Sequence, residues 1–111
     1  MTVSQLCESI GGKIIAAADA SDNLIKGGYT CDFLSFVIGK AKSEDAWITV
    51  IGNVNTIAVA SLADVGCIIL AEDSPLDEDA KDKAEMVGIP VISSSKNSFE
   101  LSVELGKLLG M

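Results

Sequence analysis

Polar side chains lie in the loops that follow three predicted buried strands. In many parallel sheets, loops at this position bind ligands. The strands are predicted over residues 46–51, 67–71 and 89–92. In such sheets these loops meet at one edge, and helix N-termini there point at bound anions. Hydroxyl, amide and backbone N–H groups at this edge could hold a phosphate or a ribose, although turns and helix caps need the same residue types. The polar stretches are Gly52-Asn53 with Asn55-Thr56, Glu72-Asp73-Ser74, and Ser93-Ser94-Ser95-Lys96.

A second candidate is the glycine-rich stretch from Lys26 through Gly27 and Gly28 to Thr30. Paired glycines in an extended segment indicate a bulge or a close approach by a ligand or by another chain. Lys26 is the best-placed cation for an anionic ligand if this loop reaches the carboxyl edge of the sheet. Asp32, which follows the stretch, is a candidate contact or the N-cap of the next helix.

The sequence contains neither histidine nor arginine. This excludes histidine-dependent catalytic triads and zinc sites that use histidine. The glycine-rich dinucleotide fingerprint and the P-loop are also absent. The adjacent acids Glu72 and Asp73 precede a predicted helix. Acids at this position more often interact favourably with the positive end of the helix dipole than form a magnesium site. We therefore expect a binding or regulatory module rather than an enzyme, with no cofactor and no metal site.

Composition indicates one domain that spans residues 1–111. The chain is 49% hydrophobic, and its mean hydropathy is +0.42. This is typical of a globular protein of single-domain size. A formal net charge of −8 argues against nucleic acid and anionic membranes as partners. The three cysteines form no C-x-x-C motif and no export signal precedes them, which predicts a reduced, cytoplasmic protein with thiols in its core.

Residues 47–71 are long and apolar, with Asp64 as the only charged residue. Turn-forming residues at Gly52-Asn53, Asn55-Thr56 and Asp64-Val65-Gly66 interrupt the segment. These breaks favour a buried strand–helix–strand unit over a membrane span.

Helices and strands alternate along most of the chain. Capping residues predict helices that begin at Thr2, Asp32, Asn55, Ser74 and Asn97. The second of these should bury Phe33, Leu34, Val37 and Ile38. From residue 46 onward the order is strand, helix, strand, helix, strand, helix, which is typical of a parallel sheet covered on both faces. We expect a single three-layer α/β domain with a mainly parallel sheet flanked by helices. Its helices span residues 2–10, 32–41, 55–64, 74–87 and 97–109, and its strands span 13–17, 46–51, 67–71 and 89–92. Residues 24–30 form either a further strand or extended chain.

The chain resembles the DRTGG domain family. The similarity starts at Asp22-Asn23-Leu24-Ile25-Lys26-Gly27-Gly28-Tyr29 and Cys31-Asp32-Phe33-Leu34-Ser35. It continues through Trp47-Ile48-Thr49, residues 55–60, Gly88-Ile89-Pro90-Val91-Ile92-Ser93 and Phe99-Glu100-Leu101. In the motif that names the family, Asp22, Gly27 and Gly28 are present. Asn23 occupies the arginine position and Lys26 the threonine position.

The resemblance implies an accessory role. DRTGG domains are distantly similar to the N-terminal domain of HPr kinase/phosphorylase, an α/β module. They occur beside CBS domains in regulated pyrophosphatases, where they are thought to assist regulation and dimerisation near adenine-nucleotide sensing. Some free-standing copies are encoded with redox systems. The family has no established catalytic residue, so none transfers to this chain.

Two functions fit these observations. The first is a homodimeric regulatory module that binds an adenine nucleotide or another phosphorylated metabolite. The second is an interaction or dimerisation module that docks to a redox or metabolic enzyme complex without a small ligand. Residues 56–63, which form a helix with little polar face, and Phe99 and Val103 on the last helix favour the second function. The candidate ligand contacts of the first function are Lys26, Gly27, Gly28, Asp32, Asn55, Thr56, Ser93 and Ser94.

Overall fold

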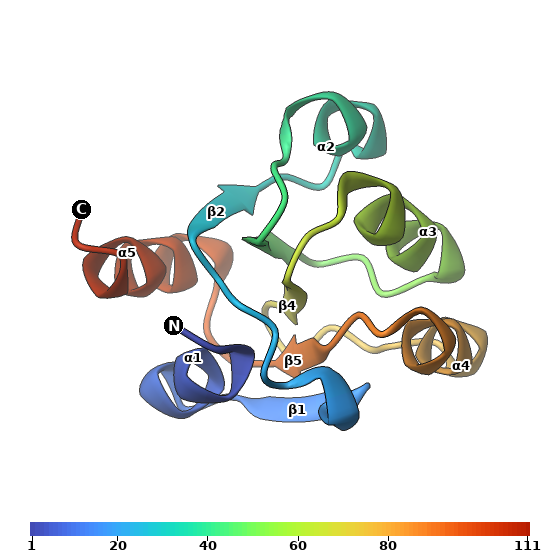
Figure 1. Cartoon of the computed structure of the whole chain (residues 1–111), viewed down its shortest axis with the longest axis horizontal. Helices are drawn as coiled ribbons and strands as arrows, with labels where there is room; N and C mark the ends of the chain where they lie inside the picture. The colour runs from blue at the N-terminus through green and yellow to red at the C-terminus, as the bar shows by residue number, and fades with distance from the viewer.

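The computed structural model describes all 111 residues and alternates helices with strands as predicted (Figure 1). One short 3₁₀ helix, η1, follows the first strand. The elements are α1 (Val3–Ile10), β1 (Lys13–Ala16), η1 (Ala18–Ala20), β2 (Gly27–Thr30), α2 (Leu34–Lys40), β3 (Asp45–Thr49), α3 (Val54–Ala63), β4 (Cys67–Leu70), α4 (Glu78–Val87), β5 (Val91–Ser93) and α5 (Ser98–Leu108).

The five strands form one mixed sheet in the order β1-β5-β4-β3-β2. Strands β2 to β5 are parallel, and β1 is antiparallel to β5. The parallel pairs follow from the intervening helices, each of which returns the chain to the starting edge of the sheet. Strand β2 is an edge strand, because it is the last in this order and has a neighbouring strand on one side alone. This edge strand carries the paired glycines.

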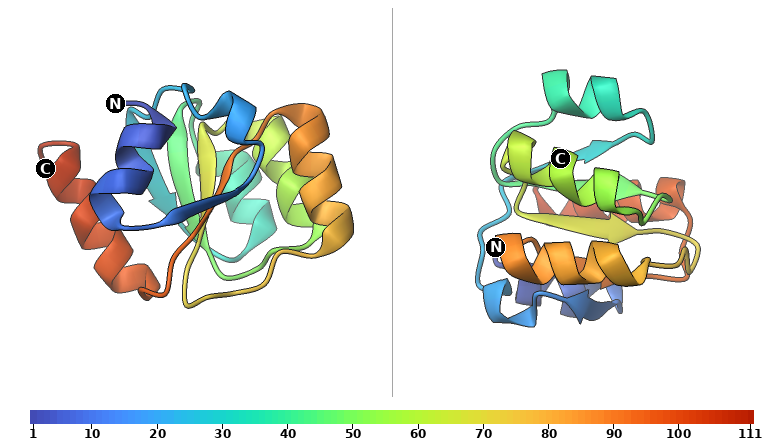
Figure 2. Two further views of the ribbon diagram at one scale, coloured as in Figure 1. Left: turned by 90° about the horizontal axis from the view of Figure 1, so that it is seen from below. Right: turned by 90° about the vertical axis from the view of Figure 1, so that its right-hand side faces the viewer.

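Helices cover both faces of the sheet (Figure 2). On one face, Leu6 of α1 and Leu101 of α5 pack with Ile48 and Ile69 of the strands. On the other face, helices α2, α3 and α4 contribute Val37, Ile57 and Ala80 to a second cluster, which includes Trp47. Strands buried on both faces read as continuous apolar runs, as expected for a covered parallel sheet. The predicted three-layer architecture is confirmed.

Two of the predicted helix caps are confirmed, and three are wrong. Thr2 and Asn97 each form a reciprocal capping box with the residue three positions later. Asn53, not Asn55, caps α3, because its side chain accepts a hydrogen bond from the Thr56 N–H. Asp32 and Ser74 cap no helix: Asp32 bonds to β3 and the loop after it, and the Ser74 hydroxyl bonds to the carbonyl of Ala71.

Helix α2 is more exposed than its apolar pattern predicted. Of the four residues expected inside, only Val37 is fully buried, and Phe33 and Ile38 are more than half exposed. The helix has seven residues and packs mainly on α3, so a single side is covered. The exposed rings of Phe33 and Phe36 pack edge to face, 5.1 Å apart, and the Lys40 ammonium lies 4.7 Å from the centre of the Phe36 ring.

Helix α3 buries the main part of its apolar face within this domain, which was the alternative to an exposed interaction surface. Its residues Ile57, Val59 and Ala60 are buried within this chain because α2 and α4 flank the helix. Leu62 is its one strongly exposed large apolar side chain. Residues 47–71 form the predicted strand–helix–strand unit. No helix combines the length and apolar character needed to cross a membrane.

Two of the three cysteines are core residues. Cys7 and Cys67 are buried as predicted, whereas Cys31 is half-buried. Burial raises the pKa of the Cys67 thiol far above its ordinary value of 9.0, and the nearby Cys7 adds to this effect. Burial also raises the pKa of Cys7. Both thiols therefore stay protonated near neutral pH, where they are weak nucleophiles.

The Cys67 pKa predicts that the protein loses stability in alkali. The folded state holds the Cys67 proton more tightly than the unfolded chain does. The stabilisation is therefore complete below about pH 9 and declines above it, by at most ~1.4 kcal/mol per pH unit. Urea unfolding at about pH 8 and about pH 10 measures the decline. Cys67→Ala, which lacks the thiol, should lose less stability over this interval. An equal loss in both proteins would contradict the prediction.

Candidate functional site

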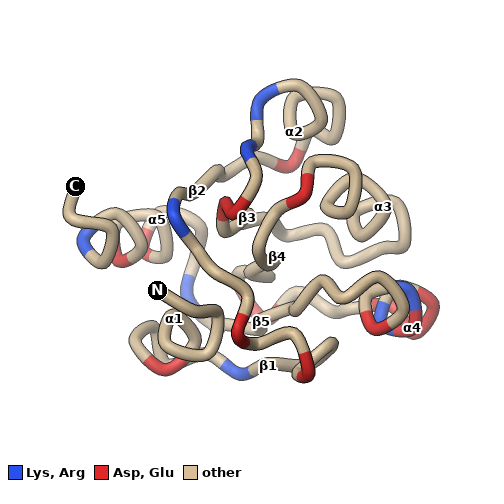
Figure 3. The backbone as a smooth tube through the Cα atoms, in the orientation of Figure 1, with Lys and Arg blue, Asp and Glu red and all other residues tan.

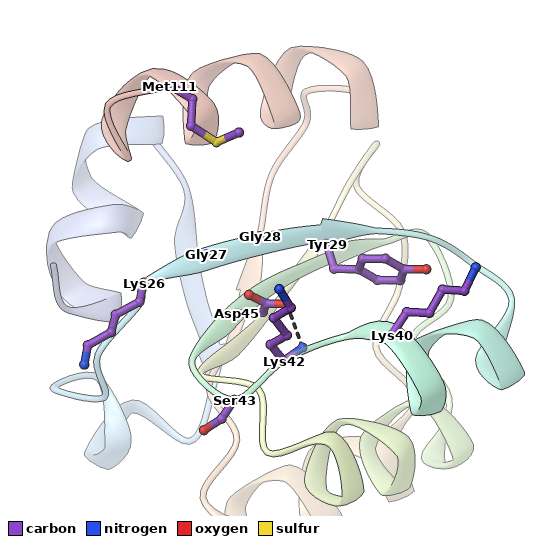
Figure 4. A pocket seen from close by; sticks show the side chains of 9 residues that line it. All are labelled: Lys26, Gly27, Gly28, Tyr29, Lys40, Lys42, Ser43, Asp45 and Met111. Carbon is purple, nitrogen blue, oxygen red and sulfur yellow. Dashed lines mark hydrogen bonds between the residues drawn. The ribbon is translucent and has the colours of Figure 1, made fainter.

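The largest cavity of the protein runs along the edge strand β2 (Figure 4). Its volume is about 470 Å³. The other three cavities measure about 170 to 250 Å³. Sites for small ligands typically occupy roughly 300–1,000 Å³. The lining residues are Lys26, Gly27, Gly28, Tyr29, Lys40, Lys42, Ser43, Asp45 and Met111.

Three lysines from separate segments meet at this cavity. Gly27 pairs with Asp45 in the parallel register of β2 and β3, so the residues before the two strands lie at the same edge. Lys26 immediately precedes β2. Helix α2 returns from the far end of β2 and ends at Lys40, and Lys42 follows in the next loop. Sequence reasoning found Lys26 but missed the other two, because their convergence depends on the strand order.

The lysines differ in their partners. The Lys26 ammonium lies 3.4 Å from a Glu44 carboxylate oxygen and points away from the middle of the cavity (Figure 4). Lys40 and Lys42 form no ion pair. Three of the eight lysines of the chain lie at this edge, together with the acids Glu44 and Asp45 at the start of β3 (Figure 3). The lysines slightly outnumber these acids, so the edge is less acidic than the chain as a whole, whose net charge is −8.

The two glycines are explained by contacts within the chain. A Cβ on Gly28 would lie 2.5 Å from a methyl carbon of Leu105 on α5. A Cβ on Gly27 would collide with the carboxylate of Asp45. The close approach at these glycines is made by side chains of this chain, whereas the sequence had suggested a ligand or another chain.

Asp45 and Tyr29 are the polar side chains between the lysines. Asp45 is 6% exposed, and its Oδ2 atom accepts a hydrogen bond from the Lys42 backbone N–H at 2.8 Å. Desolvation raises the pKa of Tyr29, and the adjacent Cys31 raises it further. The Tyr29 hydroxyl is thus a neutral group at physiological pH. Its ring and the Lys40 side chain lie at the same end of the cavity (Figure 4).

The structure separates the eight predicted contacts into two groups. Lys26, Gly27 and Gly28 line the cavity at the amino ends of β2 and β3. The loop they belong to does not reach the carboxyl edge of the sheet, which was the condition for Lys26 to act there. The other five residues lie at that opposite edge and line none of the four cavities: Asp32, Asn55, Thr56, Ser93 and Ser94.

Three of these five residues hold local structure. Asp32 Oδ1 accepts hydrogen bonds from the Thr49 hydroxyl at 2.8 Å and from the Val50 N–H at 3.1 Å. Thr56 is buried, and its hydroxyl donates to the side chain of Asn53. The buried Ser94 hydroxyl accepts from the Lys96 N–H at 3.1 Å. Their role as ligand contacts stays a prediction.

Asn23, at the arginine position of the family motif, joins two loops. Its amide donates to the carbonyls of Gly66 and Gly88, at 3.3 and 3.5 Å. These bonds connect the segment before β2 to the loops before β4 and after α4. Asn23 therefore positions the Lys26 loop and lies outside the cavity.

The fold and this motif define a known class of α/β domain. The family model for the DRTGG domain matches residues 5–108, and the chain belongs to this family. One similar solved structure contains the CBS and DRTGG domains of the regulatory region of Clostridium perfringens pyrophosphatase, complexed with its activator diadenosine tetraphosphate. The TM-score is 0.73 at 12% identity, over 94% of this chain and 45% of that chain.

At this identity the likeness concerns the fold. The present chain spans just under half of the pyrophosphatase chain to which it is similar. No curated protein sequence matches it.

Proposed function

We propose that this DRTGG domain is a non-catalytic regulatory module of the cytoplasm that binds a small anionic ligand of the adenine-nucleotide class along β2. The observation that carries the proposal is that Lys26, Lys40 and Lys42 all line the one cavity large enough for a small ligand. In a chain without arginine, lysines and backbone groups are the means of holding phosphate. The similar pyrophosphatase structure is a regulatory region bound to an adenine-containing activator, which supports the same class of ligand.

A binding role fits these residues better than a catalytic one. General-base catalysis at neutral pH most often uses histidine, and the sequence has none. Burial keeps the Cys7 and Cys67 thiols protonated, and neither thiol lines the cavity. The DRTGG domain of the similar structure belongs to a regulatory region.

The alternative is an interaction module, for which exposed apolar side chains beside β2 are the supporting observation. Phe33, Phe36 and Ile38 are exposed in and next to α2, and Phe99 and Val103 are exposed on α5. Together with the unpaired side of β2, they suit a two-fold contact between copies of the chain or a contact with a redox or metabolic enzyme. A homodimer is part of both proposals.

Calorimetric titration tests the ligand. AMP, ADP, ATP and diadenosine polyphosphates are added with and without magnesium, and light scattering gives the mass of the same sample. We expect saturable binding of at least one nucleotide, weakened by added salt because surface charges are screened. A stable dimer that binds none of them would favour the interaction module instead.

A further inference from the structure

Asp45 is the one buried acid among the 16 acidic residues of the chain. Its Oδ2 atom is held by the Lys42 N–H, and the Asp45 N–H in turn donates to the Lys42 carbonyl at 3.1 Å. The short turn between α2 and β3 therefore fixes the carboxylate in place.

The second oxygen of Asp45 has no donor in this chain. Its Oδ1 atom accepts no hydrogen bond within the chain. Every fully buried polar side-chain atom of the protein has a hydrogen-bond partner, so Oδ1 is not one of the fully buried atoms. It lies beside the bare backbone of Gly27, a residue that lines the cavity together with Asp45. Figure 4 shows this carboxylate below β2, between the strand and the Lys42 side chain.

A free carboxylate oxygen among lysines selects for a particular ligand chemistry. Inorganic phosphate and other simple polyanions have little to donate to Oδ1 and are repelled by its charge. A ligand that satisfies the whole cavity must carry a neutral hydrogen-bond donor within a few bonds of its anionic group. The hydroxyls of a ribose 5′-phosphate meet this requirement, and carboxylates commonly accept from ribose hydroxyls in nucleotide sites.

We infer that Asp45 is a specificity residue that accepts a hydrogen bond from the ribose of a ribonucleotide, whose phosphates bind the lysines. This inference rests on the proposed function and adds to it a preference for ribonucleotides over deoxyribonucleotides. Gly27 keeps the Asp45 carboxylate in this position, because the side chain of any larger residue there would displace it.

The test compares ATP with 2′-deoxy-ATP and 3′-deoxy-ATP by calorimetry on the wild-type protein. At least one deoxynucleotide should bind about tenfold more weakly, since a hydrogen bond to a charged group is lost. Equal affinity for all three would overturn the role of Asp45 while leaving the proposed function intact. Failure of all three to bind would overturn both.

Asp45→Asn provides a second measurement on the same residue. Its side-chain carbonyl can still accept from the Lys42 N–H, whereas its amide can no longer accept from a ribose hydroxyl. We expect the difference in affinity between ATP and the weaker deoxynucleotide to disappear in this variant, while the loss of the negative charge strengthens the binding of both nucleotides alike. Retained discrimination in a folded variant would overturn the inference, and the wild-type comparison decides the matter if the variant does not fold.

Discussion

Replacing Trp47 with alanine should lower the free energy of unfolding by about 3–5 kcal/mol. Trp47 is the only tryptophan, lies in β3 and is completely buried. Its removal leaves a cavity in the cluster that joins the sheet to α2, α3 and α4. Its indole N–H also donates to the Cys31 carbonyl at 2.8 Å, so the variant loses a bond that anchors the end of β2. Native domains are stable by only about 5–15 kcal/mol, so this loss is a large fraction of the total.

Urea unfolding followed by circular dichroism measures this loss without relying on tryptophan fluorescence. Met86→Ala is the control, because Met86 is also a large apolar residue but is 79% exposed, on α4, outside the surface proposed for the two-fold contact. The control should change stability by about 0.5 kcal/mol or less. A loss below about 1 kcal/mol for Trp47→Ala would contradict the described packing of this face.

Replacing Lys40 and Lys42 together with alanine should weaken ATP binding about a hundredfold. Each lysine contributes a charged donor to the phosphates, and the loss of one such contact reduces affinity about tenfold. Both side chains are exposed. The Lys42 N–H that holds Asp45 is a backbone group, so the variant keeps the shape of the cavity. The stability change should be under about 1 kcal/mol, mainly from the lost contact of Lys40 with Phe36.

Lys81→Ala with Lys83→Ala is the control for total charge. These two lysines lie on α4 and line none of the four cavities. Both double variants change the net charge by the same amount, so only a local effect can separate them. Equal weakening of ATP binding in the two proteins would show that long-range charge, and not the cavity, determines affinity.

The sequence was sufficient to predict the architecture. Continuous apolar strands such as the one at Cys67–Leu70 can be buried only between two layers of helices, and intervening helices force parallel pairing. Capping boxes at Thr2 and Asn97 depend on residues three positions apart, so local spacing was enough to find them. The resemblance to the DRTGG family, which was seen in the sequence, is confirmed by the match of the family model over residues 5–108.

The candidate site depended on information that spacing does not contain. The position of β2 at the edge of the sheet, beside β3, brings Lys26 near Lys40 and Lys42. No local pattern gives this order, so the polar residues after β3 and β5 were an equally reasonable choice. The paired glycines signalled a close approach, but only the fold shows that Leu105 and Asp45 make it. Exposure on α2 was missed because its seven residues pack mainly on α3, which covers a single side of the helix.

The titration with ATP tests the central claim most directly when amide NMR follows it residue by residue. We predict saturable shifts at residues 26–29 and 40–45, around the cavity along β2, and little change at residues 53–56 and 93–96. Saturable shifts confined to the carboxyl edge would place the ligand on the other predicted contacts. Shifts at neither edge, up to concentrations well above those of cellular nucleotides, would contradict the proposal that this domain senses a nucleotide.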